Sequence, residues 1–373
     1  MHNARDRYIV VLRLLSHHLV MKMACEKWVI LLMLSGASAT SVFAAGYQVF
    51  VTNERSGDVT VINGGDFSVA ATIAVGKRPR GIHASPDGKT IYIALSGTPI
   101  EAPPQIDVNG NPVFEKKTGG DEDDAAADKA ADGIGIMNIA AKKLTGKLRA
   151  GSDPEEFALS KDGRRIYISN EDTKTASVIS IAGAKLEHII PVGPEPEGVT
   201  TTPDGKQFYV TCEAGGDIYV VDTTSYVAVA KFKVKGRPRS VAFMSGGVGF
   251  IPSESAGELN IIDWAQAKVM QTITLPSGSR PMRVTLSPDE KRLYVSNGRA
   301  GTISVFDTHR YELLDTIKVG TRPWGIGVSP DGKFLFSANG PSNDVSVVDL
   351  STNKELRRIK AGASPWGIAI TSR

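Results

Sequence analysis

A motif centred on proline recurs along the chain and restricts its fold more than any other feature. The copies read KRPRG, SDPEE, PEPEG, GRPRS, SRPMR, TRPWG and ASPWG. Their marker prolines are Pro79, Pro154, Pro196, Pro238, Pro281, Pro323 and Pro365. Successive spacings of 75, 42, 42, 43, 42 and 42 residues indicate seven units of about 42 residues, with an insertion of about 33 in the first.

Each unit contains four strand-like runs, which in the sixth unit cover residues 324–329, 334–338, 344–349 and 355–361. The segment SPDGK between the first two is typical of a tight turn, because its glycine tolerates the positive φ that closes a hairpin. Four antiparallel strands in a repeat of this length form one blade of a propeller. The sequence therefore predicts an all-β, seven-bladed β-propeller.

The two ends of the chain complete one blade in this prediction. The last unit has a single strand-like run at 367–372, and the region before the first marker proline has three, at 48–52, 58–62 and 69–74. One C-terminal strand and three N-terminal strands make the seventh blade, which closes the ring without free strand edges.

Residues 1–44 differ from the repeats. An apolar run around residues 30–34 follows two lysines, and small side chains precede the bond after Ala44, where a signal peptidase would cut. This pattern predicts a signal peptide at 1–44. The signal could also begin at an internal methionine, which would make residues 1–20 an over-extended start. We expect residues 45–373 to form a single propeller domain.

The charge that remains outside this leader argues against nucleic-acid binding. The chain has 43 basic and 40 acidic side chains, of which the leader holds five and two. The remainder balances at 38 of each, so no global field attracts a polyanion. Outside the leader Cys212 is the sole cysteine, which excludes an intrachain disulfide there, and neither CxxCH nor HExxH occurs.

Propeller topology gathers the marker motifs on one face. With the strands of a blade named A to D from the axis outward, SPDGK joins A to B on one face. The B–C loop and the D–A connection, which carries the marker motif, must then lie on the other, which we name the mouth face. Its candidate ligand-binding residues are Arg78, Arg80, Glu155, Glu156, Glu195, Glu197, Arg237, Arg239, Arg280, Arg283, Arg322, Trp324 and Trp366.

The charges of these candidates differ by blade. Blades 2 and 3 contribute an acidic arc, and blades 4, 5, 6 and 1 contribute a basic arc with two tryptophans. One interpretation is a set of solvated loop charges that partly pair with neighbours. The other is a mouth that binds an anionic or carboxylated planar ligand, since arginine pairs with carboxylates and tryptophan offers a stacking face. The cofactor PQQ, a planar tricarboxylate, fits that description.

His83 is a further candidate. It occupies an inner-strand position where the other six units have Ala, Thr or Gly. It could be a ligand near the channel or a packed, hydrogen-bonded histidine. The sequence contains no Ser-His-Asp set, GxSxG elbow or metal triad, so we assign no catalytic residue and no metal ligand.

The insertion covers residues 96–132 approximately and falls between strands B and C of blade 1. Its segment PQIDVNGNPVFEKK alternates like a small hairpin with an NGN turn. The acidic segment GGDEDDAAADKAADG follows. Three interpretations are a solvated loop, a lid over the mouth and a calcium-attracting cluster, although the spacing does not match an EF-hand.

The strand sequences resemble a known family. Segments such as VFVTNERSGDVTVIN and LYVSNGRAGTISVFD resemble the YVTN family of β-propeller repeats, over essentially the whole chain after the leader. The ordered marker motifs look like those of the periplasmic propellers associated with PQQ-dependent alcohol catabolism. That resemblance implies a periplasmic, non-enzymatic accessory protein, which binds a small anionic ligand or a partner at the mouth. The partner would be a quinoprotein dehydrogenase, a cytochrome or a transport component.

A lactonase- or lyase-like enzyme is the alternative function. Seven-bladed enzymes of these kinds place carboxylates, histidine or a metal near the channel. In this sequence such a site would draw on Glu155, Glu156, Glu195, Glu197 and His83.

Overall fold

The computed structural model describes residues 46–100, 105–106, 112–113 and 127–372. Within these ranges the regular structure is entirely β, and no helix there is long and apolar enough to cross a membrane. The predicted signal peptide lies outside the described residues.

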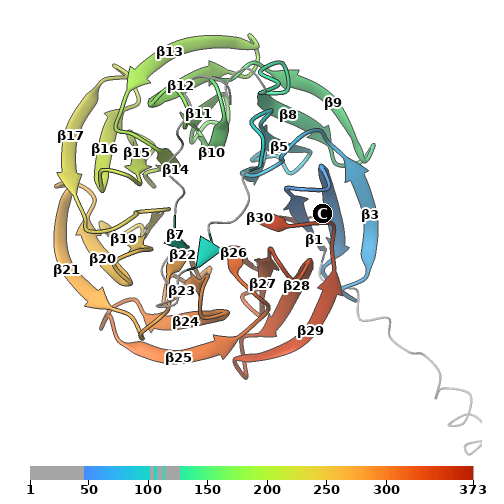
Figure 1. Ribbon diagram of the computed structural model, residues 1–373, viewed down its shortest axis with the longest axis vertical. Helices are drawn as coiled ribbons and strands as arrows, with labels where there is room; N and C mark the ends of the chain where they lie inside the picture. Colours follow the sequence, from blue (N-terminus) through green and yellow to red (C-terminus); the bar gives the residue numbers. More distant parts are fainter. Residues whose placement is uncertain (1–45, 101–104, 107–111, 114–126, 373) are drawn as a thin grey trace, which may run out of the picture. The chain divides into compact units, whose positions relative to one another are not determined.

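Seven four-stranded antiparallel sheets are arranged as blades around a central axis, in agreement with the predicted fold (Figure 1). Blade 1 contains β4 (Ile82–Ala84), β5 (Thr90–Leu95), β8 (Gly133–Asn138) and β9 (Lys143–Leu148). Blade 2 contains β10 (Pro154–Leu159), β11 (Arg165–Asn170), β12 (Thr175–Ser180) and β13 (Lys185–Pro191). Blade 3 contains β14 (Pro196–Thr201), β15 (Gln207–Cys212), β16 (Asp217–Asp222) and β17 (Ala228–Lys233).

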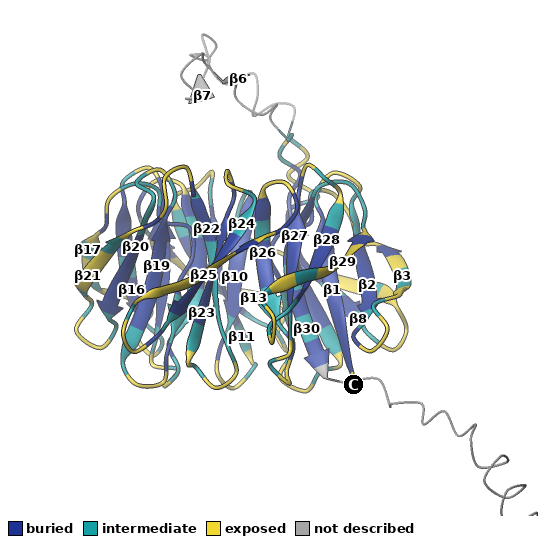
Figure 2. Cartoon of the chain, turned by 90° about the horizontal axis from the view of Figure 1, so that it is seen from below, coloured by how far each residue is buried: buried dark blue, intermediate teal, exposed yellow. Residues whose placement is uncertain are grey.

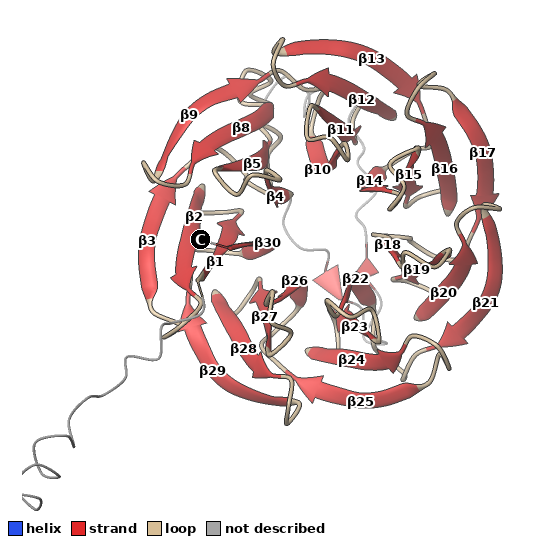
Figure 3. Ribbon diagram, turned by 180° about the vertical axis from the view of Figure 1, so that it is seen from behind, coloured by secondary structure: helices blue, strands red, loops and turns tan. Residues whose placement is uncertain are grey.

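The remaining blades follow the same order from the axis outward (Figure 3). Blade 4 contains β18 (Ala242–Phe243), β19 (Val248–Ser253), β20 (Glu258–Asp263) and β21 (Lys268–Thr274). Blade 5 contains β22 (Pro281–Leu286), β23 (Arg292–Asn297), β24 (Thr302–Asp307) and β25 (Leu313–Lys318). Blade 6 contains β26 (Pro323–Val328), β27 (Phe334–Asn339), β28 (Asp344–Asp349) and β29 (Lys354–Lys360).

The seventh blade joins both ends of the chain, as predicted. Its order is β30 (Pro365–Ser372), β1 (Tyr47–Asn53), β2 (Asp58–Asn63) and β3 (Val69–Ala74). Strand β30 pairs antiparallel with β1 from Tyr47↔Ser372 to Asn53↔Pro365. The last strand therefore fills the innermost place of a blade whose other strands come from the start of the domain.

The hydrophobic core lies between adjacent blades. The two middle strands of each blade are buried on both faces and the outermost strand is largely exposed, as Figure 2 shows. Tyr167 of blade 2 stacks on Phe208 of blade 3 with 4.3 Å between ring centroids. Because both faces of a blade pack on neighbours, the middle strands need apolar runs rather than strict alternation.

Glycines allow the inner strands to approach one another near the mouth. Gly198, Gly325 and Gly367 each stand two residues after a marker proline. A Cβ atom at these positions would lie 2.6, 2.5 and 2.6 Å from a carbonyl oxygen of the next blade. A side chain at this position is therefore excluded wherever the blades converge this closely.

The insertion is described only in part. Strands β6 (Gln105–Ile106) and β7 (Pro112–Val113) pair antiparallel, which confirms the predicted hairpin at these residues. Near the end of the insertion, Lys77 Nζ lies 2.8 Å from the Asp128 carboxylate. The segment interpreted as a lid or calcium cluster falls mostly outside the described residues.

Candidate functional site

The residue before each marker proline turns the chain into an inner strand. Its φ angle is positive at Arg78, Asp153, Glu195, Arg280, Arg322 and Ser364, with values from 43° to 61°. L-residues adopt this left-handed region at a cost in free energy. The surrounding contacts of the fold must therefore hold these residues in that conformation. Blade 4 departs from this pattern, because Gly236 takes the positive φ there.

The B–C loops and the marker motifs share one face, as the topology predicted. The amide of the first loop residue donates to the carbonyl oxygen before the marker proline of the same blade. These bonds are Glu54–Ser364, Glu171–Asp153, Glu213–Glu195, Glu254–Arg237, Gly298–Arg280 and Gly340–Arg322, with N···O distances from 2.8 to 3.4 Å. The first residue of each B–C loop is thus fixed beside the motif.

Four glutamates at these loop positions belong to the site but escaped the sequence analysis. They are Glu54, Glu171, Glu213 and Glu254. Each directly follows the strand whose end gives the tetrapeptide pattern, as in VTNE, ISNE, VTCE and IPSE. The sequence did contain a signal for these glutamates. When the repeats are aligned, blades 5 and 6 have glycine at the position where these four loops have glutamate.

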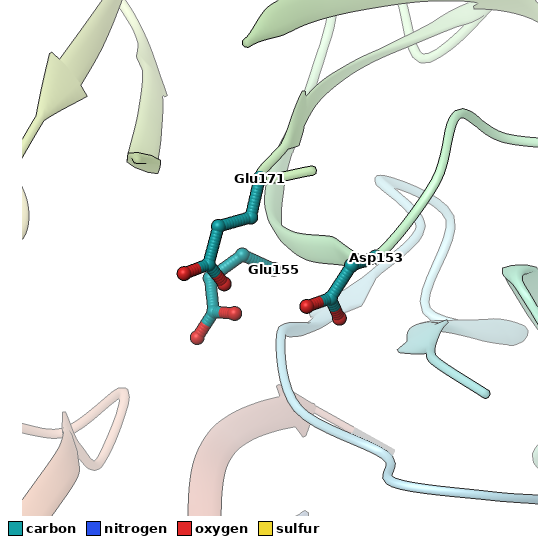
Figure 4. Close-up of side chains that lie close together, drawn as sticks. All are labelled: Asp153, Glu155 and Glu171. Carbon is teal, nitrogen blue, oxygen red and sulfur yellow. The ribbon is translucent and has the colours of Figure 1, made fainter. Parts of the chain in front are cut away.

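Arg80 forms the centre of a buried ionic cluster. Its side chain is 2% exposed and its guanidinium contacts the carboxylates of Asp153 and Glu155, with Glu171 4.0 Å away. Figure 4 shows these three carboxylates converging. Their oxygen atoms lie within 4.8 Å of one another, as in a cation site. The Arg80 guanidinium already supplies a positive charge to this group, which is the compensation that buried carboxylates require.

The carboxyl groups around Arg80 differ in pKa. Burial raises the pKa of Glu155 well above its ordinary value and outweighs the attraction of Arg80. Burial also raises the pKa of Glu171, to about 7. The pKa of Asp153 is lowered, because Arg80 and Arg78 outweigh its burial. Asp153 is therefore the ionised partner of Arg80 in this cluster, and the two glutamates retain protons more readily.

Arg239 forms a second ionic cluster between blades 3 and 4. Its guanidinium lies 2.8 Å from Glu197, 2.5 Å from Glu213 and 2.7 Å from Glu254. Glu213 also pairs with Arg237. Arg239 outweighs burial and lowers the pKa of Glu197 to about 2. The predicted acidic and basic arcs are thus joined by ion pairs.

An ion pair crosses the channel between blades 2 and 5. A guanidinium nitrogen of Arg283 contacts Glu156 Oε2, and Glu156 Oε1 lies 2.9 Å from His83 Nε2. Burial opposes ionisation of Glu156, but Arg283 and His83 outweigh it and lower its pKa to about 2. Because an ionised carboxylate can only accept, Nε2 of His83 carries the hydrogen of this bond. His83 is therefore both hydrogen-bonded and, at 43% side-chain exposure, accessible from the channel.

Two tryptophans continue this arrangement. The rings of Trp324 and Trp366 stack with 5.6 Å between centroids. The Arg283 guanidinium carbon lies 4.9 Å from the Trp366 ring centre, and the Arg322 carbon lies 5.1 Å from that of Trp324. Cation–π contacts of this kind hold arginines over an aromatic surface.

Among the described residues, the mouth face has clefts that could hold a ligand, and two of them have measured volumes. The larger, of about 790 Å³, is lined by residues that include Glu171, Glu195, Glu213 and Arg237. The other, of about 460 Å³, is lined by residues that include Glu54, Arg78 and Asp128. Both volumes suit a small ligand.

The structure brings most of the candidates together. The ion pairs above include Arg80, Glu155, Glu156, Glu197, Arg237, Arg239, Arg283 and His83. Arg78 pairs with Glu54. Glu195 stands at the edge, 4.0 Å from Arg237. The interpretation as solvated loop charges is wrong for Arg80, Arg239, Glu155 and Glu156, whose side chains are buried.

The pKa of Glu171 predicts a pH effect on stability. A carboxyl group whose folded pKa is about 7, against 4.5 unfolded, binds more protons in the folded state between these values. Its contribution therefore stabilises the fold as the pH falls from about 8 to 5. We expect the melting temperature to rise over this range, and to rise less in Glu171→Gln. Glu312→Gln, at an exposed position, is the control and should follow the wild type. Equal pH slopes in the wild type and Glu171→Gln would contradict the assignment.

Comparison with known proteins adds a family match. The model of a family described as lactonase, 7-bladed beta-propeller, matches residues 192–364, which span blades 3 to 6. No curated protein matches the chain.

Several solved structures share the fold. A Bacteroides fragilis protein described as a candidate 6-phosphogluconolactonase is 19% identical, with 90% of this chain and 99% of that chain covered and a TM-score of 0.68. The periplasmic gluconolactonase of Pseudomonas aeruginosa is 18% identical, with 87% of this chain and 99% of that chain covered and a TM-score of 0.66. The hydrazine synthase of Kuenenia stuttgartiensis is 19% identical, with 78% of this chain and 89% of that chain covered and a TM-score of 0.63. One fold serves proteins of different activities here, so function must be argued from the site.

The family match corrects the expected function. We expected a non-enzymatic accessory protein, and this expectation is wrong, because the matching family is a lactonase family. The alternative, a lactonase- or lyase-like enzyme, is favoured instead. The predicted seven-bladed propeller is confirmed. Binding of PQQ and of the named periplasmic partners stays a prediction.

Proposed function

We propose that this protein is a lactonase, which hydrolyses a small lactone at the channel mouth. The observation that carries the proposal is the contact between His83 and the ionised Glu156. An imidazole held by a carboxylate and open to solvent is the arrangement that activates water in hydrolases. The family model supports a lactone as the substrate class.

The geometry supports a definite division of roles. Since Nε2 of His83 donates to Glu156, Nδ1 of the neutral ring is the basic nitrogen. Nδ1 removes a proton from water as the water oxygen attacks the lactone carbonyl. The proton then passes to the ring oxygen as its bond to the carbonyl carbon breaks, which yields the hydroxy acid. Arg283, paired with Glu156, is the cation nearest this pair and is suited to stabilise the developing oxyanion.

We also propose that the protein acts in the periplasm. The signal-peptide pattern at residues 1–44 supports this location. The name of the Pseudomonas aeruginosa periplasmic gluconolactonase is consistent with it. Edman sequencing of protein recovered from the periplasm should begin after Ala44.

Lactone hydrolysis tests the proposed function. Purified protein is assayed by pH-stat on glucono-δ-lactone, 6-phosphoglucono-δ-lactone and γ-butyrolactone, with spontaneous hydrolysis subtracted. We expect turnover of at least one lactone, and a loss in kcat of about 10²- to 10⁴-fold in His83→Gln, because general-base catalysis contributes about that much.

His309→Gln is the matched control, since His309 is exposed and belongs to the β24–β25 connection away from the site. It should retain full activity. A wild type that hydrolyses none of the three lactones would refute the lactonase proposal. Full activity in His83→Gln with loss in Glu171→Gln would instead move the base to Glu171 in the larger cleft.

A further inference from the structure

Arginines and glutamates of the mouth form a pair that repeats between blades. The arginine stands before a marker proline, and the glutamate begins the B–C loop of the preceding blade. Arg78 Nε lies 2.9 Å from Glu54 Oε1, and Arg237 Nε lies 2.6 Å from Glu213 Oε2. Both arginines use Nε to contact the glutamate. The arginine before the marker proline is therefore neutralised with the same geometry in both blades.

Blade 6 has the arginine without its glutamate. Arg322 precedes the marker proline Pro323, and the loop residue of the preceding blade is Gly298. The Gly298 amide donates to the Arg280 carbonyl at 2.8 Å, as the Glu213 amide donates to that of Glu195. Gly298 is thus the structural equivalent of Glu213. Across the described part of the chain, Arg322 makes no ion pair.

Arg280 in blade 5 also lacks a carboxylate. The repeat would pair it with Glu254, but Glu254 lies 2.7 Å from Arg239 instead. No ion pair of Arg280 occurs among the residues that the structure describes. Among the described residues, the mouth therefore has ion-paired arginines before the marker prolines of blades 1 and 4, and arginines without an ion pair before those of blades 5 and 6.

An aromatic ring lies beside the Arg322 guanidinium. The Arg322 guanidinium carbon is 5.1 Å from the centre of Trp324, whose ring stacks on the buried Trp366. Arg239 lies 5.4 Å from the same Trp324 ring, so the indole is held between fixed neighbours. Burial lowers the pKa of Arg322 and outweighs the attraction of Glu254 and Glu54, although a guanidinium remains protonated in proteins.

We infer that Arg322, whose guanidinium lies over the Trp324 ring, forms an anion subsite that takes the carboxylate or phosphate group of a small ligand, with Arg280 of the neighbouring blade as a second arginine without an ion pair. The ligand's anionic group takes the place of the glutamate side chain that Gly298 lacks. Guanidinium groups bind both anions in a bidentate way, and the Trp324 ring holds the Arg322 guanidinium in place. The inference rests on the proposed function for the identity of the ligand as a lactone, and it narrows the substrates to those with a negative charge.

Calorimetric titration tests the subsite separately from catalysis. The probes are glucose 6-phosphate, glucuronate and glucose, which share a ring and differ in charge. We expect one or both anionic sugars to bind the wild type, and glucose to bind at least 10-fold more weakly. The better of the two anions identifies phosphate or carboxylate as the natural group. Arg322→Gln should weaken its binding by about 10- to 100-fold, the value of one charge-assisted contact.

Gly298→Glu restores the glutamate of the other blades and provides a sharper variant. A Cβ atom at Gly298 would lie 3.0 Å from Cγ and 3.3 Å from Sδ of Met282, a flexible side chain that can adjust. We expect Gly298→Glu to abolish anion binding by neutralising Arg322. Gly298→Gln has the same shape without the charge and should bind nearly as the wild type does.

Arg299→Gln controls for general electrostatics, because Arg299 is exposed in the loop next to Gly298. It should leave the affinity unchanged. Equal anion binding in the wild type, Arg322→Gln and Gly298→Glu would refute the subsite, as would no binding of either anionic sugar to the wild type. If anion binding depends on Arg322 but no lactone is hydrolysed, the subsite stands and the proposed function fails.

Discussion

Removal of residues 365–373 is expected to abolish cooperative folding. The deleted strand β30 is the innermost strand of blade 7 and pairs with β1. Its loss exposes the edge of β1 and uncovers Trp324 of blade 6 and Arg283 of blade 5, which contact Trp366. The Gly367 amide donates to Thr52 Oγ1, which itself donates to the Arg80 carbonyl, both at 2.8 Å. One strand therefore supports three blades, and its removal leaves the edge of β1 unprotected.

Circular dichroism during heating and limited proteolysis measure this effect. We expect the truncated chain to show no sharp melting transition and to be degraded rapidly. A circular permutant is the control, because Tyr47 and Ser372 are paired and a short linker can join them. New ends between Gly246 and Gly247 fall in an exposed turn, where such openings are tolerated. A wild-type melting temperature in the truncated protein would contradict closure by β30.

Substitution of Arg80 by methionine is expected to destabilise the fold by about 3–5 kcal/mol, the usual effect of removing one partner from a buried ion pair. Asp153 and Glu155 are buried and would lose the charge that compensates them. Without Arg80 we expect the folded pKa of Asp153 to rise, because burial is then opposed by less positive charge. The ionised carboxylate is less favourable in the folded variant than in the folded wild type, so the deficit in stability should grow as the pH increases.

Denaturant unfolding at pH 5 and pH 8 measures this difference. The deficit of Arg80→Met relative to the wild type should be larger at pH 8. Arg164→Gln removes a side chain that is 82% exposed and should change the unfolding free energy by less than about 0.5 kcal/mol. A deficit that is small, or equal at both pH values, would show that Arg80 does not balance the buried carboxylates.

The fold could be predicted because its signal repeats. Seven marker prolines, 42 or 43 residues apart except across the one insertion, indicated the number of blades and the shared blade 7, and the SPDGK turns identified the mouth face. These inferences use only the period of the chain. The strands, their order and the position of the motifs agree with them.

The pairing within the site could not be predicted in the same way. Arg283 and Glu156 are 127 positions apart, and nothing in a local pattern indicates that their side chains meet. Burial was also hidden, because arginines beside prolines in loop-like motifs are ordinarily solvated. The loop glutamates Glu54, Glu171, Glu213 and Glu254 differ in this respect. They occupy one aligned position of the repeat and could have been found in the sequence.

The ion pair across the channel changes how the ring can come apart. In a repeat array each unit contacts its neighbours, and one unit can loosen while distant units stay intact. Glu156 and Arg283 both stand two residues after a marker proline, where four other blades have glycine. Their contact ties blade 2 to blade 5 along a diameter of the ring. Neither blade can move outward without breaking the ion pair between Glu156 and Arg283. Loosening of blade 2 is therefore coupled to blade 5, although the two blades are not neighbours in the ring.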